Sequence, residues 1–244
     1  MKAQVLFLIG LFSVFGCADK KSDPKQNAKI EKTAEAAVEQ DVKNPSDFIP
    51  ESFKIFEQID GDLNKDGLQD RVIIIKGTSK DSIVEVDNQG KVDRNRRGLI
   101  VLFKHKKGYS LACKNYNCFS SENEDGGVYM PPELWLYIKR GNLYVHYAHG
   151  RYGYCRYVFG YKKSDFALIG YDSSDNNGPI VNSETSINFL TEKKRKRVNT
   201  NDEAEGGDEV FEETWEDIYV EDPLLLSEIK DFDSLDIDEC YAQQ

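Results

Sequence analysis

Residues 61–70 read GDLNKDGLQD and are followed at once by the apolar run VIII at residues 72–75. Short oxygen-bearing side chains recur at every second position early in this stretch, and Gly67 permits the sharp bend that would let them converge. A hard cation such as Ca²⁺ binds about six to eight oxygens, so the stretch predicts a calcium loop over residues 60–70. The predicted ligands are the side chains of Asp62, Asn64, Asp66 and Asp70 and the backbone carbonyl of Leu68.

The loop begins like an EF-hand, but Ile73 stands where that motif needs a bidentate glutamate. The β-branched residues that follow predict a strand rather than the second helix of an EF-hand. Asp, Asn and Gly are also the ordinary residues of turns. A tight turn that holds no ion and merely starts a strand is therefore the alternative interpretation.

The string GDLNKDGLQDRVIII at residues 61–75 resembles the Asp-x-Asp-x-Asn/Asp-x-Asp-Gly-x-x-Asp element of FG-GAP and VCBS-type repeats. Those repeats are blades of β-propellers, as in integrin α-subunits, and their acidic loops bind calcium. The element occurs once in this chain, which is similar in this respect to secreted bacterial proteins that carry it singly. The resemblance implies a calcium loop and no particular reaction.

The first 17 residues, MKAQVLFLIGLFSVFGC, contain one lysine, an apolar run, a small residue and a cysteine. A transmembrane helix needs about 20 apolar residues, so the shorter run at residues 1–16 is predicted to be a signal peptide. The ending VFGC resembles a bacterial lipobox, which implies that Cys17 receives lipid. An ordinary signal peptide with a chance cysteine is the alternative. The expected location is the cell envelope, as an outer-membrane lipoprotein that faces the periplasm or the outside.

Residues 17–50 are predicted to be the lipidated cysteine and a flexible tether. They are rich in Lys, Glu, Ala and Asp and contain no aromatic residue before Phe48. Such a stretch cannot bury enough apolar area to offset the entropy lost on ordering it. A stably docked helix is the alternative. The composition changes near residue 51, and residues 51–244 suffice for one domain with its own core.

Short β-rich runs separated by Gly, Asn, Asp and Lys pairs follow from residue 51 onward, a pattern typical of antiparallel sheets. The predicted fold class is mainly β, with antiparallel meanders or hairpins in one domain that is sandwich-like or a partial propeller. Residues 78–97 are expected to be irregular, and a short helix is compatible with the C-terminal segment. The clearest strands are expected at residues 70–76, 99–105, 109–114, 134–139, 142–148, 154–161 and 166–172.

The hairpin around residues 140–142 can be assigned face by face, because strand side chains alternate between two faces. Its core face is formed by Leu134, Leu136, Ile138, Leu143, Val145 and Tyr147. Its other face carries a candidate ligand platform made of Trp135, Tyr137, Tyr144 and His146. Two interpretations remain open: a second sheet or a loop covers this face, or the rings stay exposed and stack on a flat ligand such as a sugar ring.

The chain is acidic, with a formal net charge of −11 at pH 7. Nucleic acids and anionic lipid headgroups attract positive surfaces, so the composition argues against both as partners. Residues 193–197 read KKRKR, but residues 202–222 are strongly acidic. The basic run is therefore predicted to be solvated or paired within the molecule rather than bound to nucleic acid.

Four cysteines follow Cys17, and export would permit disulfides among them. The simplest pairing joins Cys113 to Cys118 across KNYN, while other connectivities and free thiols are the alternatives. Zinc is less expected, because the chain has no Cys-x-x-Cys and His146 and His149 lie three apart in an expected strand. That spacing directs the two imidazoles to opposite faces.

The sequence contains none of the motifs GxSxG, GxxxxGK[ST], HExxH or GxGxxG. The carboxylates of Glu122, Glu124 and Asp125 stand in a polar stretch and are interpreted as loop charge. We therefore expect a non-enzymatic binding or structural role at the cell envelope, with a glycan or an envelope protein as partner. The alternatives are a hydrolase of envelope polysaccharide or peptide, and an accessory subunit of an envelope assembly.

Overall fold

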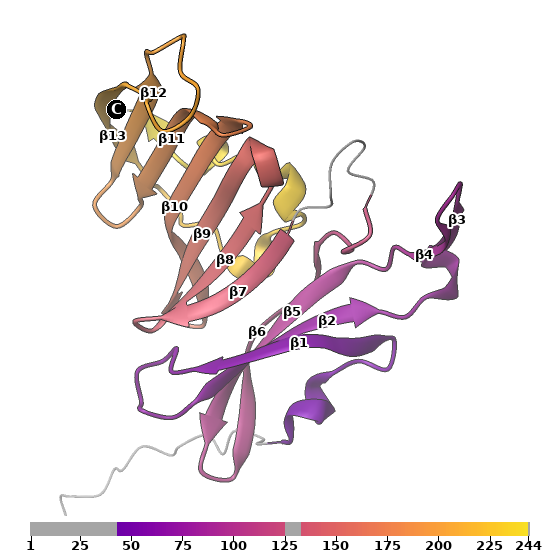
Figure 1. Ribbon diagram of the computed structural model, residues 1–244. Coiled ribbons are helices and arrows are strands. Elements are labelled where there is room, and N and C mark those ends of the chain that lie inside the picture. The colour runs from indigo at the N-terminus through magenta and orange to yellow at the C-terminus, as the bar shows by residue number, and fades with distance from the viewer. Residues whose placement is uncertain (1–42, 125–132, 244) are drawn as a thin grey trace, which may run out of the picture. The chain divides into compact units, whose positions relative to one another are not determined.

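The computed structural model describes residues 43–124 and 133–243, which belong to one compact unit (Figure 1). The strand pairs that it describes are all antiparallel. The predicted mainly β fold class is therefore confirmed. The predicted signal peptide, Cys17 and most of the predicted tether lie outside the described residues.

A four-stranded sheet is built from the first half of the unit in the order β1-β2-β5-β6. Its strands are β1 (Phe53–Gly61), β2 (Asp70–Gly77), β5 (Arg97–His105) and β6 (Gly108–Phe119). The predicted calcium loop connects β1 to β2. The β-branched run of β2 is buried on both faces of the sheet, since Val72 and Ile74 join one apolar cluster and Ile73 and Ile75 join another.

An eight-stranded sheet follows as a meander in the order β14-β13-β12-β11-β10-β9-β8-β7. Sequential strands are neighbours throughout, as expected for short hairpin connections. Its strands are β7 (Glu133–Lys139), β8 (Asn142–Ala148), β9 (Gly153–Lys162), β10 (Asp165–Asn177), β11 (Ile180–Asn188), β12 (Lys193–Asn199), β13 (Phe211–Tyr219) and β14 (Ala242–Gln243).

Residues 78–97 are more regular than predicted. Lys80–Ser82 forms the short 3₁₀ helix η2, and β3 (Ile83–Val86) pairs with β4 (Gly90–Asp93) in a small separate hairpin. The turn between these strands ends at Gly90, whose φ of +73° is easily adopted by glycine. The polar composition hid a hairpin whose strands are only four residues long.

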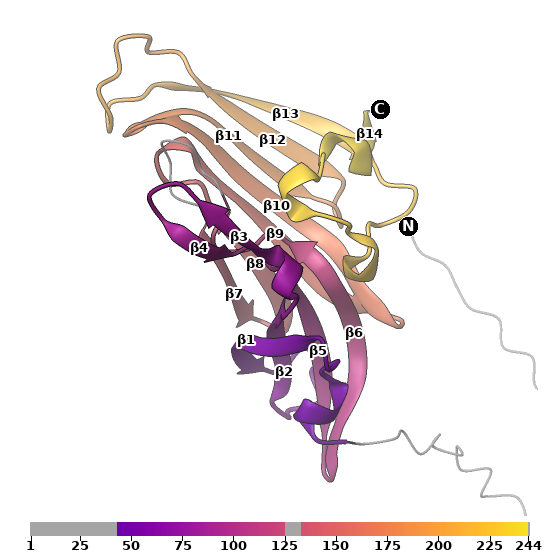
Figure 2. The ribbon, with the colours of Figure 1, turned by 90° about the vertical axis from the view of Figure 1, so that its right-hand side faces the viewer.

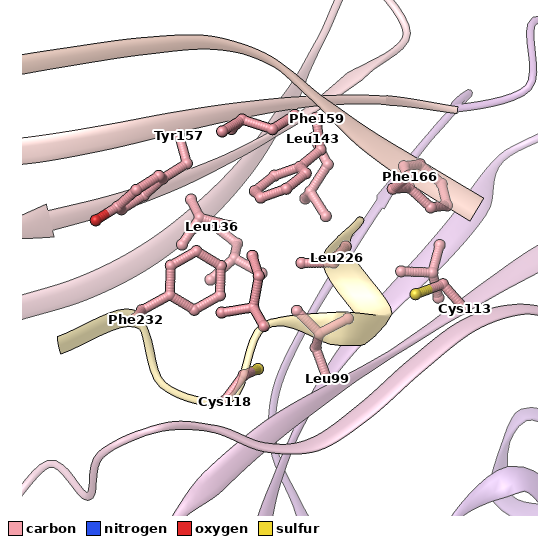
Figure 3. Packing of buried hydrophobic residues seen from close by; sticks show 14 of the residues in the cluster. Leu99, Cys113, Cys118, Leu136, Leu143, Tyr157, Phe159, Phe166, Leu226 and Phe232 are labelled. Carbon is pink, nitrogen blue, oxygen red and sulfur yellow. The ribbon is translucent and has the colours of Figure 1, made fainter. Parts of the chain in front are cut away.

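The main core lies between the two sheets and the C-terminal segment (Figure 3). Leu99 comes from β5, Leu143 from β8, Phe159 from β9 and Phe232 from the C-terminal segment, and all of them are buried. Because both sheets contribute one face to a common cluster, the arrangement is consistent with the sandwich-like alternative of the prediction.

The far face of the four-stranded sheet is covered by residues that the sequence assigned to the tether. Phe48 and Ile49 pack against the second cluster, formed by Ile73, Ile75, Ile100 and Leu102. Pro45–Phe48 forms the 3₁₀ helix η1, and Lys43 bridges to Tyr109. Residues 43–50 are therefore not a flexible tether, because the apolar face of β2 and β5 needs a cover.

The C-terminal segment forms no α-helix within its described residues and instead runs beside the eight-stranded sheet in three 3₁₀ turns (Figure 2). These turns are η4 (Leu226–Glu228), η5 (Phe232–Ser234) and η6 (Asp238–Cys240). Leu226 and Phe232 are buried, and the Asn115 amide donates to the carbonyls of Leu226 and Ile229. The segment thereby closes the core without forming a helix of its own.

Candidate functional site

The carboxylate of Asp62 organises the predicted calcium loop. It accepts the backbone N–H of Lys65 at 2.6 Å, of Asp66 at 3.2 Å and of Gly67 at 3.0 Å. Lys65 and Gly67 adopt positive φ values of 65° and 84°, so the chain makes the sharp bend that the glycine predicted. The Asp66 carboxylate accepts the backbone N–H of Leu68 at 2.8 Å and the Asn64 amide at 3.0 Å.

Asp70 has a different environment from the other loop residues, because it is fully buried. Its Oδ2 atom accepts the backbone N–H of Leu63 at 2.8 Å and of Asn64 at 3.3 Å, and its Oδ1 atom accepts that of Lys104 at 2.9 Å. Burial raises the pKa of this carboxyl, although these backbone donors oppose the effect. Asp70 therefore ties the loop to the end of β5 and places a negative charge among neutral backbone donors.

The predicted ligands surround the loop but do not form a complete metal site in the structure. Within residues 43–124 and 133–243, no three His, Cys, Asp or Glu side chains are grouped so that they could hold a metal ion. The donors that fit calcium are oxygens throughout, and the buried carboxylate of Asp70 would gain from a nearby cation. Calcium binding thus stays a prediction that the chemistry of the donors supports.

The loop lies against the turn between β7 and β8. A Cβ on Gly141, at φ +76°, would lie 2.7 Å from Cε of Lys65 and 3.6 Å from the carbonyl oxygen of Asp62. A Cβ on Gly61 would similarly lie 2.8 Å from Cγ2 of Ile138. The loop is therefore in close contact with the hairpin that carries the predicted aromatic platform.

The four predicted platform residues lie on the outer face of the eight-stranded sheet, away from the main core. The pairing of β7 with β8 places Trp135 opposite His146 and Tyr137 opposite Tyr144, as the face assignment predicted. The first pair stacks with ring centroids 4.3 Å apart and planes 18° apart, the second with 4.6 Å and 12°. Tyr154 of β9 stacks on His146 at 5.1 Å and extends the row.

This row of rings, which we call the aromatic ladder, is open to solvent at the edge of the sheet. Trp135 is 40% exposed and its strand β7 is the last of the eight, while the rings behind it are half-buried by one another. Offset stacking leaves part of each ring face uncovered. Burial, followed by the nearby charge of Arg156, lowers the pKa of His146, which favours the neutral imidazole in the stack.

The outer face changes from aromatic to charged residues across the sheet. Arg156 pairs with Asp172 at 2.9 Å, and the Asp172 carboxylate also accepts the Ser186 hydroxyl at 2.8 Å. The predicted basic run forms β12, whose outward cations pair with carboxylates of the neighbouring strands. These pairs are Lys193 with Asp217, Arg195 with Glu213 and Arg197 with Glu184. The structure thus shows the basic run paired within the molecule, as the sequence predicted.

A buried lysine is a feature that the sequence analysis missed. Lys76 ends the apolar run of β2 and is 2% exposed, with its ammonium bonded to Glu122 and 3.2 Å from the Asp93 carboxylate. Glu122, expected to be loop charge, thus has a structural partner. The Glu124 carboxylate accepts the backbone N–H and the hydroxyl of Ser121. Asp125 lies outside the described residues.

The four described cysteines are free thiols in the structure. Cys113 and Cys118 are both buried on β6, and Figure 3 shows Leu99 and Leu226 lying between them. Cys155 accepts a hydrogen bond from the Tyr171 hydroxyl at 3.3 Å. The predicted Cys113–Cys118 bridge is therefore not formed in this structure.

No protein-family model, curated protein or solved structure matches this chain. Of the helices in the described part of the chain, none has the length and apolar character needed to cross a bilayer.

Proposed function

We propose that this chain is an exported, lipid-anchored, calcium-binding β-domain with a non-enzymatic binding role at the cell envelope. The aromatic ladder is the proposed binding surface, and an envelope glycan is the proposed ligand. The observation that carries this proposal is the open row of Trp135, His146 and Tyr154 on a face that the core does not use. An aromatic surface left open to water is unusual unless it binds something.

The geometry of the ladder suits a ligand made of linked sugar rings. Trp135, His146 and Tyr154 come from three adjacent strands with nearly parallel ring planes, 18° and 17° apart. Parallel rings at regular spacing present repeated apolar strips, against which the apolar faces of successive sugars can pack. Arg156 and Asp172 continue the same face and supply charged hydrogen-bonding groups for hydroxyls.

A binding role is favoured over hydrolysis by the partners of the nearby carboxylates. Glu122 pairs with the buried Lys76, and Glu124 bonds to Ser121. A glycosidase needs two carboxyl groups that flank the scissile bond. These two glutamates already serve the packing of their own segment, and no observation favours the hydrolase or the accessory subunit as a second candidate.

Calcium has a positional role in this proposal. An ion held by Asp62, Asn64, Asp66, Asp70 and the Leu68 carbonyl would offset the negative charge of the loop. The loop contacts the β7–β8 turn through Lys65 and Gly141. Calcium would therefore rigidify the support of the hairpin that carries Trp135 and Tyr137.

The lipid at Cys17 would hold the domain at the envelope, and the acidic charge of the chain favours no nucleic-acid partner. Cys17→Ala is expected to release the protein from the membrane fraction. Unchanged membrane fractionation of this variant would contradict the anchor.

The binding surface is tested by sedimenting the protein with isolated cell-wall polysaccharide. Trp135→Ala should lower the bound fraction about tenfold, since stacking on one aromatic ring contributes roughly 1–2 kcal/mol. Trp215→Ala is the matched control, because Trp215 is a 62% exposed tryptophan of the same sheet that is outside the ladder. Equal binding by both variants would refute the ladder as the binding surface.

A further inference from the structure

The outer edge of β7 has no neighbouring strand in the described sheet order. The eight-stranded sheet ends at β7, which pairs on one side with β8. An edge strand leaves a row of backbone N–H and C=O groups available for another strand. The side chains of β7 read ELWLYIK, which is a mostly apolar and aromatic sequence for a strand at an open edge.

This sequence is complementary to itself when it is read in the opposite direction. In an antiparallel pair centred on Leu136, Glu133 lies opposite Lys139 of the second copy, and Lys139 lies opposite the second copy's Glu133. Opposite charges placed directly across a strand pair are favourable. Neither side chain forms an ion pair within the described part of its own chain. Their β8 neighbours, Ala148 and Asn142, are uncharged.

The same register joins like faces of the two sheets. Trp135 lies opposite Tyr137 of the second copy on the outer face, and Leu134 lies opposite the second copy's Ile138 on the core side. A shift by one residue would instead place the core face of one copy beside the outer face of the other. In the centred register, the aromatic ladder continues from one copy into the next without a break.

The other long edge strands lack this property. Self-pairing of β1 about its central residue would place Glu57 against its own copy, and β1 is irregular between Ile55 and Glu57. Self-pairing of β13 about Trp215 would place Glu213 against Asp217. Like charges directly opposite one another are destabilising, so complementary charge selects β7.

We propose that two copies of this chain associate through antiparallel pairing of their β7 strands, centred on Leu136, to form one continuous sheet. The occupant of the β7 edge is thus a second copy of the same chain. The proposal rests on the strand order and on the charge pattern of β7, and it does not depend on the ligand of the ladder. Where glycan binding also holds, the dimer would double the length of the aromatic surface.

Charge reversal tests this pairing with exposed residues that do not support the fold. Sedimentation velocity of the full chain in mild detergent, over a concentration series, should show a monomer–dimer equilibrium. E133K sets two lysines opposite each other at both ends of the strand pair, and K139E sets two glutamates opposite each other there. Each single variant should weaken dimerisation at least about tenfold, with an unchanged thermal midpoint of the folded domain.

Two rescues make the register explicit. The double variant E133K/K139E restores both opposite-charge pairs and should dimerise within about threefold of the original chain. An equimolar mixture of E133K and K139E should form a mixed dimer, because each chain then presents one sign of charge to the other. A monomer at all concentrations up to about 100 μM, or a dimer that neither single reversal weakens, would overturn the proposal.

Discussion

At the scale of single residues, Asp70 is the buried acceptor on which the calcium loop depends. Its carboxylate accepts three backbone N–H groups, from Leu63, Asn64 and Lys104. The sequence identified Asp70 as an oxygen donor, but it contained no signal of this second, structural role. Lys76 was missed for a related reason, since its partners Asp93 and Glu122 are distant in the chain. Contacts of this kind appear only when the strands have paired.

Asp70→Asn should destabilise the domain even without calcium. An amide replaces one acceptor oxygen with a donor, so at least one buried backbone N–H loses its partner, at a cost of about 1–3 kcal/mol. Urea unfolding in the presence of a chelator measures this loss. Asp87→Asn, in the exposed β3–β4 turn, is the control and should change little. An unchanged unfolding midpoint for Asp70→Asn would contradict the anchoring role.

The pH dependence of the same pair of proteins tests the charge of Asp70. Burial raises the pKa of this carboxyl in the folded state, so the folded protein holds the proton more tightly than the unfolded chain does. Without calcium, the stability of the original protein relative to Asp70→Asn should fall as pH rises from about 4 through that raised pKa. Saturating calcium favours the charged form and should reverse the trend. A difference that is independent of pH would contradict this account.

At the scale of elements, the strands with apolar or aromatic alternation were predicted and the charged ones were not. The seven expected strands correspond to β2, β5, β6, β7, β8, β9 and β10. In contrast, β12 consists mainly of Lys and Arg and is stabilised by acidic residues of β11 and β13. Its stability comes from cross-strand charge pairs, for which hydrophobic periodicity provides no signal.

Gly98 is the residue that the β5–β6 pairing needs at its irregular point. A Cβ there would lie 2.3 Å from the backbone of Asn115 and Tyr116, beside the register shift between Arg97 and Leu99. Gly98→Ala should therefore cost about 2 kcal/mol or more, because a backbone must move. Gly90→Ala has free space around its Cβ and should cost about 1 kcal/mol from its positive φ. Thermal melts compare the two, and equal losses would contradict the steric argument.

The calcium loop is tested at the same scale. At about 100 times its dissociation constant, calcium should stabilise the fold by about 2.7 kcal/mol, because it offsets the repulsion among the loop carboxylates. Asp66→Ala should remove most of this increment, whereas Asp87→Ala should keep it. Thermal melts in millimolar calcium and in chelator measure the difference. A midpoint that calcium leaves unchanged in the original protein would reduce the loop to a tight turn.

At the scale of the whole molecule, the sequence predicted the class of fold and one face of the site. Strand alternation in β7 and β8 was enough to separate core residues from Trp135 and Tyr137. The addition of Tyr154 and the row of charges beyond it required the meander order of all eight strands. The C-terminal segment closes the core through Leu226 and Phe232, which periodicity could not place because its 3₁₀ turns are so short.

The ladder as a binding surface is tested most directly by the fluorescence of Trp135. The chain contains two tryptophans, so Trp215→Phe leaves Trp135 as the single reporter, stacked on His146 and exposed at the sheet edge. Titration with soluble fragments of cell-wall polysaccharide should change its emission in a saturable manner, because a sugar ring packed on the indole excludes water. Emission that stays constant up to about millimolar fragment would contradict the proposed function.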